Sequence, residues 1–162
     1  MSETIVLYVT RDGHSRSLAL DVGSRLGTEV REIGDLVNRK GPFGWLNSGR
    51  QAAMGRATPI GDPGVELKGI GTVVLVQPVW ASSVCPPVRS WIKAHASELT
   101  GKRLALLASG YGTPASVLRS KFDAEFGCAP GKLFACAAVP QKEDEAARRK
   151  RVDDFVAELG RE

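Results

Sequence analysis

The chain has 162 residues, of which 43% are hydrophobic and 25% are charged, a composition typical of a globular protein with one buried core. We therefore expect one domain over residues 1–162. The net charge of +4 is too small to indicate a nucleic-acid-binding protein. No apolar run approaches the roughly 20 residues of a membrane-spanning helix, so we expect no integral membrane segment and a cytoplasmic protein.

The first part of the chain alternates between strand and helix patterns. Thr4–Val9 is an apolar run of strand length, and Ser15–Leu26 has the spacing of a helix with one apolar face. Thr28–Ile33 predicts a second, weaker strand. A longer segment follows, in which we expect a short helix over Gly44–Arg56 and then a connector, TPIGDPG.

The remaining chain predicts three more strands, at Gly71–Val79, Arg103–Ala108 and Lys132–Val139. A helix between the first two begins near Pro86 and Pro87, because proline suits the first turn of a helix. Its apolar face is predicted to comprise Val88, Trp91, Ile92, His95 and Leu99. Thr113 and Pro114 are expected to be the N-cap and first residue of the next helix, and a last helix buries Val152, Phe155, Val156 and Leu159.

Strands that alternate with helices predict an α/β fold with a parallel sheet and helices on both faces. Ligands of such sheets bind beyond the carboxyl ends of the strands. Three loops that leave those ends have an unusual composition: TRDGHS, PVWASSVCPP and SGYGTP. Their convergence at one edge predicts a binding site there.

The first loop has the features of a phosphate site. Thr10, Ser15 and His14 offer hydrogen-bonding side chains, Gly13 lets the backbone turn, and the following helix points free amides at the loop. Asp12 carries the wrong charge and must point away or accept from the loop's own amides. Ser15 alone would also fit a simple N-cap.

The other two loops supply aromatic residues and a thiol. An exposed Trp80 and an exposed Tyr111 beside a phosphate site indicate a flat aromatic ligand, although Trp80 also fits the core. Cys85 fits a reactive thiol or, more simply, a small packing residue. Trp45 either caps the pocket or packs into the core.

Over nearly its whole length the chain resembles the flavodoxin-like FMN-binding proteins. TRDGHS resembles their phosphate loop, and PVWASSVCPPVRSWI is similar to the segment that runs along the flavin ring. GPFGWLNSGRQAAMGR is similar to a helical insert of small bacterial members. The resemblance implies a three-layer sandwich around a five-stranded parallel sheet of order 2-1-3-4-5.

The resemblance also implies a site for one non-covalent FMN. The residues implied to enclose the phosphate are Thr10, Arg11, Asp12, Gly13, His14 and Ser15. Those implied to line the two sides of the flavin are Pro78, Val79, Trp80 and Ala81, and Ser109, Gly110, Tyr111 and Gly112. Two positions depart from the family pattern: Asp12 replaces a hydroxyl, and Ala81 replaces a frequent glycine.

The expected function is electron transfer or oxidoreduction through FMN, from NAD(P)H or a redox partner to a quinone-like or protein acceptor. No side chain is assigned as a catalytic acid or base. Two alternatives stay open: a non-enzymatic module that has lost or repurposed FMN, and an enzyme similar to protoporphyrinogen oxidases, which share the TRDG spelling. Such folds work as monomers and as dimers, so a homodimer stays open too.

Other residues favour structural roles. An odd count of cysteines (Cys85, Cys128 and Cys136) without CxxC spacing argues against a disulfide framework and a zinc site, and we expect no metal. The basic run Arg148–Arg151 follows acidic residues, as on a solvated helix face. His95 is expected to be a satisfied packing histidine.

Overall fold

Five parallel strands form the central sheet of the computed structural model, which describes residues 3–37, 40–55, 57–127 and 132–161. The spatial order is β2-β1-β5-β6-β7. The strands are β1 (Glu3–Tyr8), β2 (Val30–Glu32), β5 (Ile70–Pro78), β6 (Arg103–Gly110) and β7 (Lys132–Pro140). Counted along this sheet the order is 2-1-3-4-5, which confirms the predicted sandwich. The topology reverses between β1 and β5, where such sheets bind their ligands.

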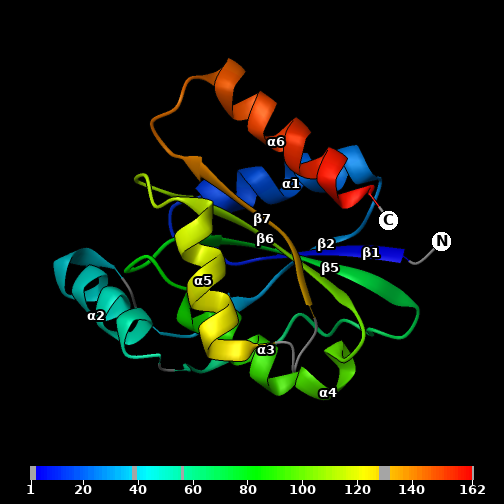
Figure 1. Ribbon diagram of the computed structural model, residues 1–162. Helices are drawn as coiled ribbons and strands as arrows, with labels where there is room; N and C mark the ends of the chain where they lie inside the picture. The colour runs from blue at the N-terminus through cyan, green and yellow to red at the C-terminus, as the bar shows by residue number, and fades with distance from the viewer. Residues whose placement is uncertain (1–2, 38–39, 56, 128–131, 162) are drawn as a thin grey trace.

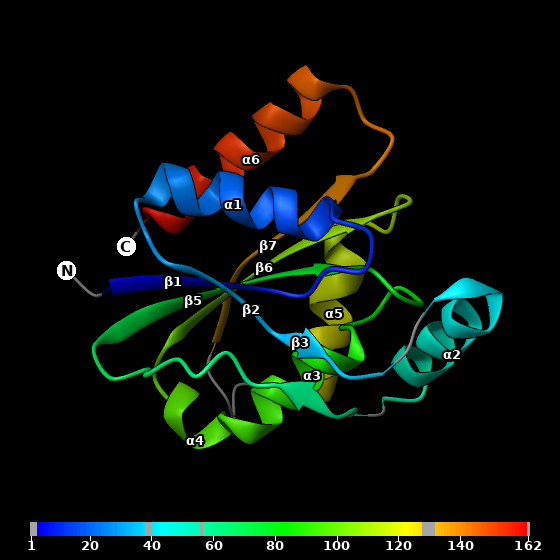
Figure 2. The ribbon, with the colours of Figure 1, turned by 180° about the vertical axis from the view of Figure 1, so that it is seen from behind.

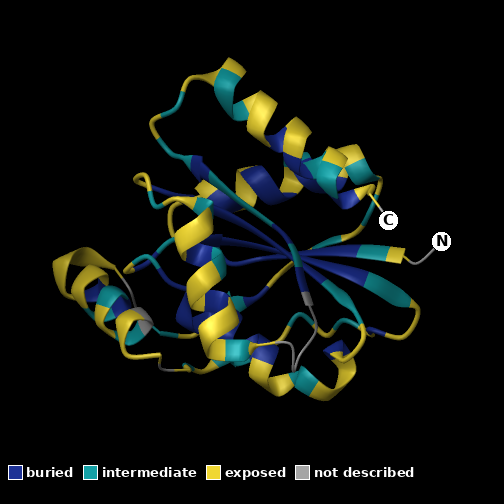
Figure 3. Cartoon of the chain, in the orientation of Figure 1, coloured by how far each residue is buried: buried dark blue, intermediate teal, exposed yellow. Residues whose placement is uncertain are grey.

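Helices cover both faces of the sheet (Figure 1). On one face lie α1 (His14–Leu26) and α6 (Glu145–Leu159). On the other lie α3 (Pro86–Ala94), α4 (Ala96–Leu99) and α5 (Ala115–Phe126). The middle strands are apolar on both sides because both sides are buried, and Figure 3 shows them as the buried layer between exposed helix surfaces.

A small arm stands beside the sheet (Figure 2). It consists of β3 (Gly34–Asp35), α2 (Gly41–Ala53) and β4 (Ile60–Gly61), and β3 pairs with β4 in antiparallel fashion. Gly34 and Gly61 let these strands meet, because a Cβ on Gly34 would lie 3.3 Å from the Gly61 Cα. The helix expected over residues 44–56 is α2, which begins earlier, at Gly41, and ends earlier, at Ala53. Arg56, the predicted end of that helix, and Cys128, one of the three cysteines, lie outside the described residues.

The helix predicted from Pro86 to Leu99 is interrupted at His95, whose φ and ψ are −108° and 15°. The His95 ring stacks on Trp91 at a centroid distance of 4.7 Å, and its Nε2 and Nδ1 lie 2.8 Å from carboxylate oxygens of Asp62 and Glu98. Burial alone would lower the pKa of His95, but the two carboxylates outweigh it and raise the pKa. His95 is thus satisfied as expected, through ion pairs that hold the connector after β4 against α3.

The basic run on α6 forms a solvated face, as predicted. Arg149 lies 3.4 Å from Glu145, and Lys150 lies 2.7 Å from Asp154. These pairs join residues four positions apart on one helix. Among the helices of the described residues, none is long and apolar enough to cross a membrane.

The sheet ends at β7, which pairs with β6 on one side only. The register with β6 shifts so that Phe134 is an extra, bulged residue. The Arg119 guanidinium of α5 donates to the carbonyls of Leu133 and Phe134 at 2.8 and 3.2 Å. The first half of this edge strand is therefore distorted and partly covered.

Candidate functional site

The three predicted loops converge on one cleft at the carboxyl ends of β1, β5 and β6. The cleft has a volume of about 520 Å³, within the range of small-molecule sites. Nine of the residues predicted from sequence line it: Arg11, Asp12, Pro78, Val79, Trp80, Ala81, Ser109, Gly110 and Tyr111.

The loop after β1 turns at Gly13, whose φ of +95° strongly favours glycine. The Gly13 amide donates to Thr10 Oγ1 at 2.9 Å, and the His14 amide donates to Asp12 Oδ1 at 3.2 Å. Asp12 therefore accepts from the loop, which is one of the two arrangements expected for it. Arg11 is exposed and lines the cleft.

Ser15 is buried rather than capping α1. Gly13 is the N-cap residue, so the N-cap interpretation of Ser15 is wrong. The Ser15 and Ser109 hydroxyl oxygens lie 3.1 Å apart, and both side chains are 2% exposed or less. This contact ties the first turn of α1 to the end of β6, although the two residues are far apart in sequence.

The loop after β5 contains a tight turn at residues 80–83. The Ser83 amide donates to the Trp80 carbonyl at 3.1 Å, and the two central residues, Ala81 and Ser82, both have a positive φ, 50° and 53°. Lys121 Nζ donates to the Ala81 carbonyl at 3.1 Å. Ser82 and Thr113 hydroxyl oxygens lie 3.2 Å apart. The turn is held from two sides in a conformation that non-glycine residues rarely adopt.

The buried side-chain amide of Gln77, in β5, fixes the same loop by two hydrogen bonds. Gln77 Oε1 accepts from the Cys85 amide at 2.9 Å, and Gln77 Nε2 donates to the Ser83 carbonyl at 3.3 Å. Cys85 is itself fully buried, which fits a packing residue rather than a reactive thiol. Trp80 is only 8% exposed and belongs to the core while one side lines the cleft. Of the two interpretations of Trp80, the core one is confirmed and the exposed one is wrong.

A buried ion pair lies beside this loop. The Arg89 side chain is fully buried, and its guanidinium binds both carboxylate oxygens of Glu125, with a distance of 3.0 Å from Nη2 to Oε2. The pair joins α3 to α5. The sequence had placed Arg89 only within a motif and had not predicted its partner.

The third loop begins later than expected, because Ser109 and Gly110 belong to β6. Tyr111 is 80% exposed and lines the cleft, as predicted. Gly112 has a φ of +124° and lies outside the cleft lining. The helix α5 begins at Ala115 with Pro114 as N-cap, so the predicted cap at Thr113 is wrong by one residue.

Trp45 of α2 is 64% exposed and reaches the cleft, so it is not a core residue. Four further lining residues were not predicted as site residues: Gly49, Ser82, Thr113 and Gln141. Ser82 and Thr113 lie within the loops already singled out, and Gln141 directly follows β7. For these three, the position just beyond a strand was the available signal, whereas Gly49 lies within α2 and had none.

Five predicted residues lie next to the cleft rather than in its lining: Thr10, Gly13, His14, Ser15 and Gly112. The His14 side chain lines a neighbouring cavity of about 300 Å³ together with Ser109 and Arg148. Of the loop from Thr10 to Ser15, only Arg11 and Asp12 line the cleft itself.

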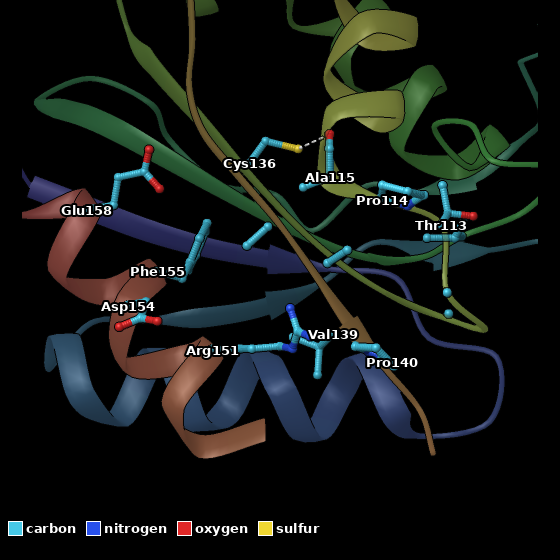
Figure 4. A pocket seen from close by; sticks show the side chains of 15 residues that line it. Thr113, Pro114, Ala115, Cys136, Val139, Pro140, Arg151, Asp154, Phe155 and Glu158 are labelled. Carbon is cyan, nitrogen blue, oxygen red and sulfur yellow. Dashed lines mark hydrogen bonds between the residues drawn. The ribbon is translucent and has the colours of Figure 1, made fainter. Parts of the chain in front are cut away.

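A second cavity, of about 330 Å³, lies against β7 between α5 and α6 (Figure 4). It shares Val79, Gly110 and Thr113 with the cleft. Cys136 lines it and donates to the Ala115 carbonyl at 3.6 Å. Burial raises the pKa of Cys136 to about 11, so the thiol stays protonated at neutral pH.

No known family model matches the chain, and no curated protein matches it in sequence. Solved structures do match in architecture. A flavoprotein of Lactobacillus acidophilus in complex with FMN has a TM-score of 0.73 at 14% identity, over 96% of this chain and 99% of that one.

Two further structures extend the likeness. A flavodoxin, WrbA-like protein of Agrobacterium tumefaciens has a TM-score of 0.60 at 11% identity, over 97% and 96% of the two chains. Oxidised flavodoxin 1 of Bacillus cereus has a TM-score of 0.55 at 14% identity, over 96% and 95%. At such identities the likeness is one of architecture, and the chain has the flavodoxin-like fold.

Proposed function

We propose that the chain is a redox protein that holds one FMN non-covalently in the cleft of the three loops. The carrying observation is the convergence of a glycine turn at the start of α1 with an aromatic-lined cleft at the switch point of the sheet. The FMN complex of the Lactobacillus flavoprotein, which shares this architecture, supports the same ligand.

The residues present fit FMN in size and chemistry. The cleft of about 520 Å³ has aromatic rings from Trp45, Trp80 and Tyr111, which suit a flat ring system. The N-terminus of α1 offers backbone amides to an anion bound near it, and Arg11 in the cleft lining adds positive charge. A phosphate there would be held mainly by backbone groups.

Bound FMN supplies the exchange of electrons or hydride. The protein's part is placement. Trp80 would fix one side of the ring because it is anchored in the core, whereas the exposed Tyr111 would contact the other side. Gln77 would keep the turn after Trp80 at a constant distance from the ring. No side chain is required as an acid or base.

The proposed electron donor is a nicotinamide nucleotide or a redox protein, and the acceptor is a quinone-like compound or a protein. The open cleft and the exposure of Tyr111 and Trp45 give a reactant access from the solvent side. NAD(P)H oxidation by the isolated FMN-loaded protein would separate an enzyme from a carrier that needs a dedicated reductase.

One observation favours the alternative of a module without flavin. Two amides of the phosphate loop, those of Gly13 and His14, are already occupied by Thr10 and Asp12. An incoming phosphate must therefore use the remaining amides or displace these contacts, and Asp12 opposes it by charge.

The deciding experiment is the visible spectrum of the purified protein, followed by titration of the flavin-free protein with FMN and, separately, riboflavin. We expect stoichiometric FMN binding and much weaker riboflavin binding, because riboflavin lacks the phosphate. No binding of FMN at high micromolar concentration would reject the proposal and favour the flavin-free module. Equal affinity for the two flavins would remove the phosphate role from the first loop.

The same titration tests the role of Trp80. The substitution Trp80→Ala is expected to weaken FMN binding and to shift the visible absorption band, because it removes the anchored ring. An unchanged spectrum and affinity would place the flavin elsewhere.

A further inference from the structure

The helix α2 presents its apolar side chains to solvent. Phe43, Leu46, Arg50 and Ala53 are spaced three, four and three residues apart, so they form one stripe along the outside of the helix. Phe43 is 87% and Leu46 is 63% exposed. We call these four residues the α2 stripe.

The inward side of α2 is small and polar instead. Gly44 is buried, and Ser48 is 2% exposed, with its hydroxyl donating to the Gly44 carbonyl at 2.7 Å. A surface helix normally buries its apolar stripe. Here α2 packs against the rest of the protein through small residues and leaves its large apolar side chains exposed. Such an exposed apolar patch is typical of an interaction surface.

The stripe continues into a groove of about 440 Å³ at the end of α2. Met54, 52% exposed, lies on one side, with Lys93 of α3 and Lys121 of α5 among the other lining residues. The groove also includes Arg89 and Glu125, whose charges neutralise each other as a pair. We call this the basic groove.

Apart from Arg89, the cationic side chains on this surface have no carboxylate partner among the described residues. Within the described part of the chain, the side chains of Arg50 and Lys93 are exposed and make no hydrogen bond or ion pair, and the Lys121 side chain donates only to the Ala81 carbonyl. Three positive charges, those of Arg50, Lys93 and Lys121, therefore accompany an exposed apolar stripe. Their field adds to the chain's net charge of +4.

We propose that the α2 stripe and the basic groove together bind an acidic amphipathic segment of a partner protein. Its apolar side chains would cover Phe43 and Leu46, and its carboxylates would face the three cations. A second copy of this chain fits less well, because a symmetric contact would bring the same positive surface against itself. A flat lipid surface cannot fill a groove between α3 and α5.

The surface adjoins the cleft through the turn after β5. Ser83 lines the basic groove while its amide binds the Trp80 carbonyl, and Lys121 holds Ala81. A partner here would sit directly behind the loop that lines the cleft. Only the identification of that partner as an electron donor or acceptor rests on the proposed function; the docking surface does not need flavin.

The test uses a fluorescein-labelled helical peptide with leucines on one face and glutamates beside them, and a matched peptide with glutamine in place of every glutamate. Binding to the full chain is measured by fluorescence anisotropy at low and high salt, with and without FMN. We expect the glutamate peptide to bind and the binding to weaken with salt. The glutamine peptide should bind at least about fivefold more weakly.

Two double variants locate the surface. Arg50→Gln with Lys93→Gln is expected to weaken binding of the glutamate peptide by about five- to tenfold. Phe43→Ser with Leu46→Ser should weaken binding of both peptides by about tenfold or more, because apolar contact area is lost. All four side chains are exposed, so circular dichroism spectra should stay those of the native protein.

The matched controls lie away from the surface. Lys68→Gln removes an exposed lysine that precedes β5, at the opposite end of the sheet, and Leu20→Ser removes a 50% exposed leucine of α1. Both controls should bind the peptide like the native chain.

Several outcomes would overturn the proposal. The first two are equal binding of the two peptides and binding that neither double variant changes. The third is self-association in ultracentrifugation that Phe43→Ser with Leu46→Ser abolishes. The fourth is co-sedimentation with phosphatidylglycerol-containing vesicles that the same double variant abolishes. Failed FMN titration with intact peptide binding would reject only the proposed function. Normal FMN binding without peptide binding would reject only the docking surface.

Discussion

The turn at residues 80–83 is a place where a glycine should stabilise the protein. Ala81 and Ser82 hold left-handed backbone conformations, with φ of 50° and 53°, in a loop fixed by Gln77 and Lys121. Because the surrounding contacts determine this conformation, the strain persists in the folded chain. The substitution Ala81→Gly removes the strained Cβ and no hydrogen bond.

The expected gain follows from two opposing terms. A left-handed conformation destabilises a residue with a Cβ by about 1–2 kcal/mol relative to glycine. Glycine in turn gives the unfolded chain freedom worth about 0.4–1 kcal/mol. We therefore expect Ala81→Gly to raise the free energy of unfolding by about 0.5–1 kcal/mol. Ser82→Gly should gain less, because it also loses the contact with Thr113, worth about 0.5–1.5 kcal/mol.

Urea denaturation of the flavin-free protein measures this difference without a contribution from bound ligand. The matched control is Ala157→Gly on the exposed side of α6, where right-handed backbone makes glycine unfavourable. That control should lose about 1 kcal/mol. If Ala81→Gly lost as much as the control, the turn would not be strained and the reasoning would be refuted.

Three further predictions concern other parts of the chain. Gly13→Val should reduce FMN affinity at least about tenfold, because valine disfavours a φ of +95° even though no atom lies within 4 Å of the added Cβ; unchanged affinity in the titration would contradict it. The stability that protonated His95 gains from Asp62 should be complete below its usual pKa of 6.5 and be lost as pH rises through the raised pKa. Urea midpoints from pH 5 to 9 should show this fall, and His95→Gln should abolish it. Glu125→Gln should cost about 3 kcal/mol, because it removes the carboxylate that offsets the buried positive charge of Arg89; a loss below about 1 kcal/mol in urea denaturation would contradict it.

The strands and their order were predictable because buried parallel strands are continuous apolar runs, as in Ile70–Pro78. The position of the cleft followed from the same reasoning, since strand ends of a parallel sheet share one edge. The boundary at Ser109 was less predictable, because strand pairing with β5 and β7 extends β6 beyond its apolar residues.

Other features depend on contacts that no local pattern encodes. The break at His95 accompanies contacts with Asp62, which is distant in sequence. Trp80 is buried at the start of a loop whose later residues, Ser83 and Cys85, are bound by Gln77 of β5. The outward orientation of Phe43 contradicts the usual assumption that the apolar side of a helix faces the core.

The edge strand β7 has a consequence for how the molecule behaves in a crowded solution. An open, regular strand edge is a template onto which another chain can add a strand, and it leads to fibrous aggregates. The bulge at Phe134 and the two bonds from Arg119 interrupt this template over the first half of β7. Loss of the Arg119 side chain would therefore expose this edge and favour association of chains at high concentration, independently of any ligand.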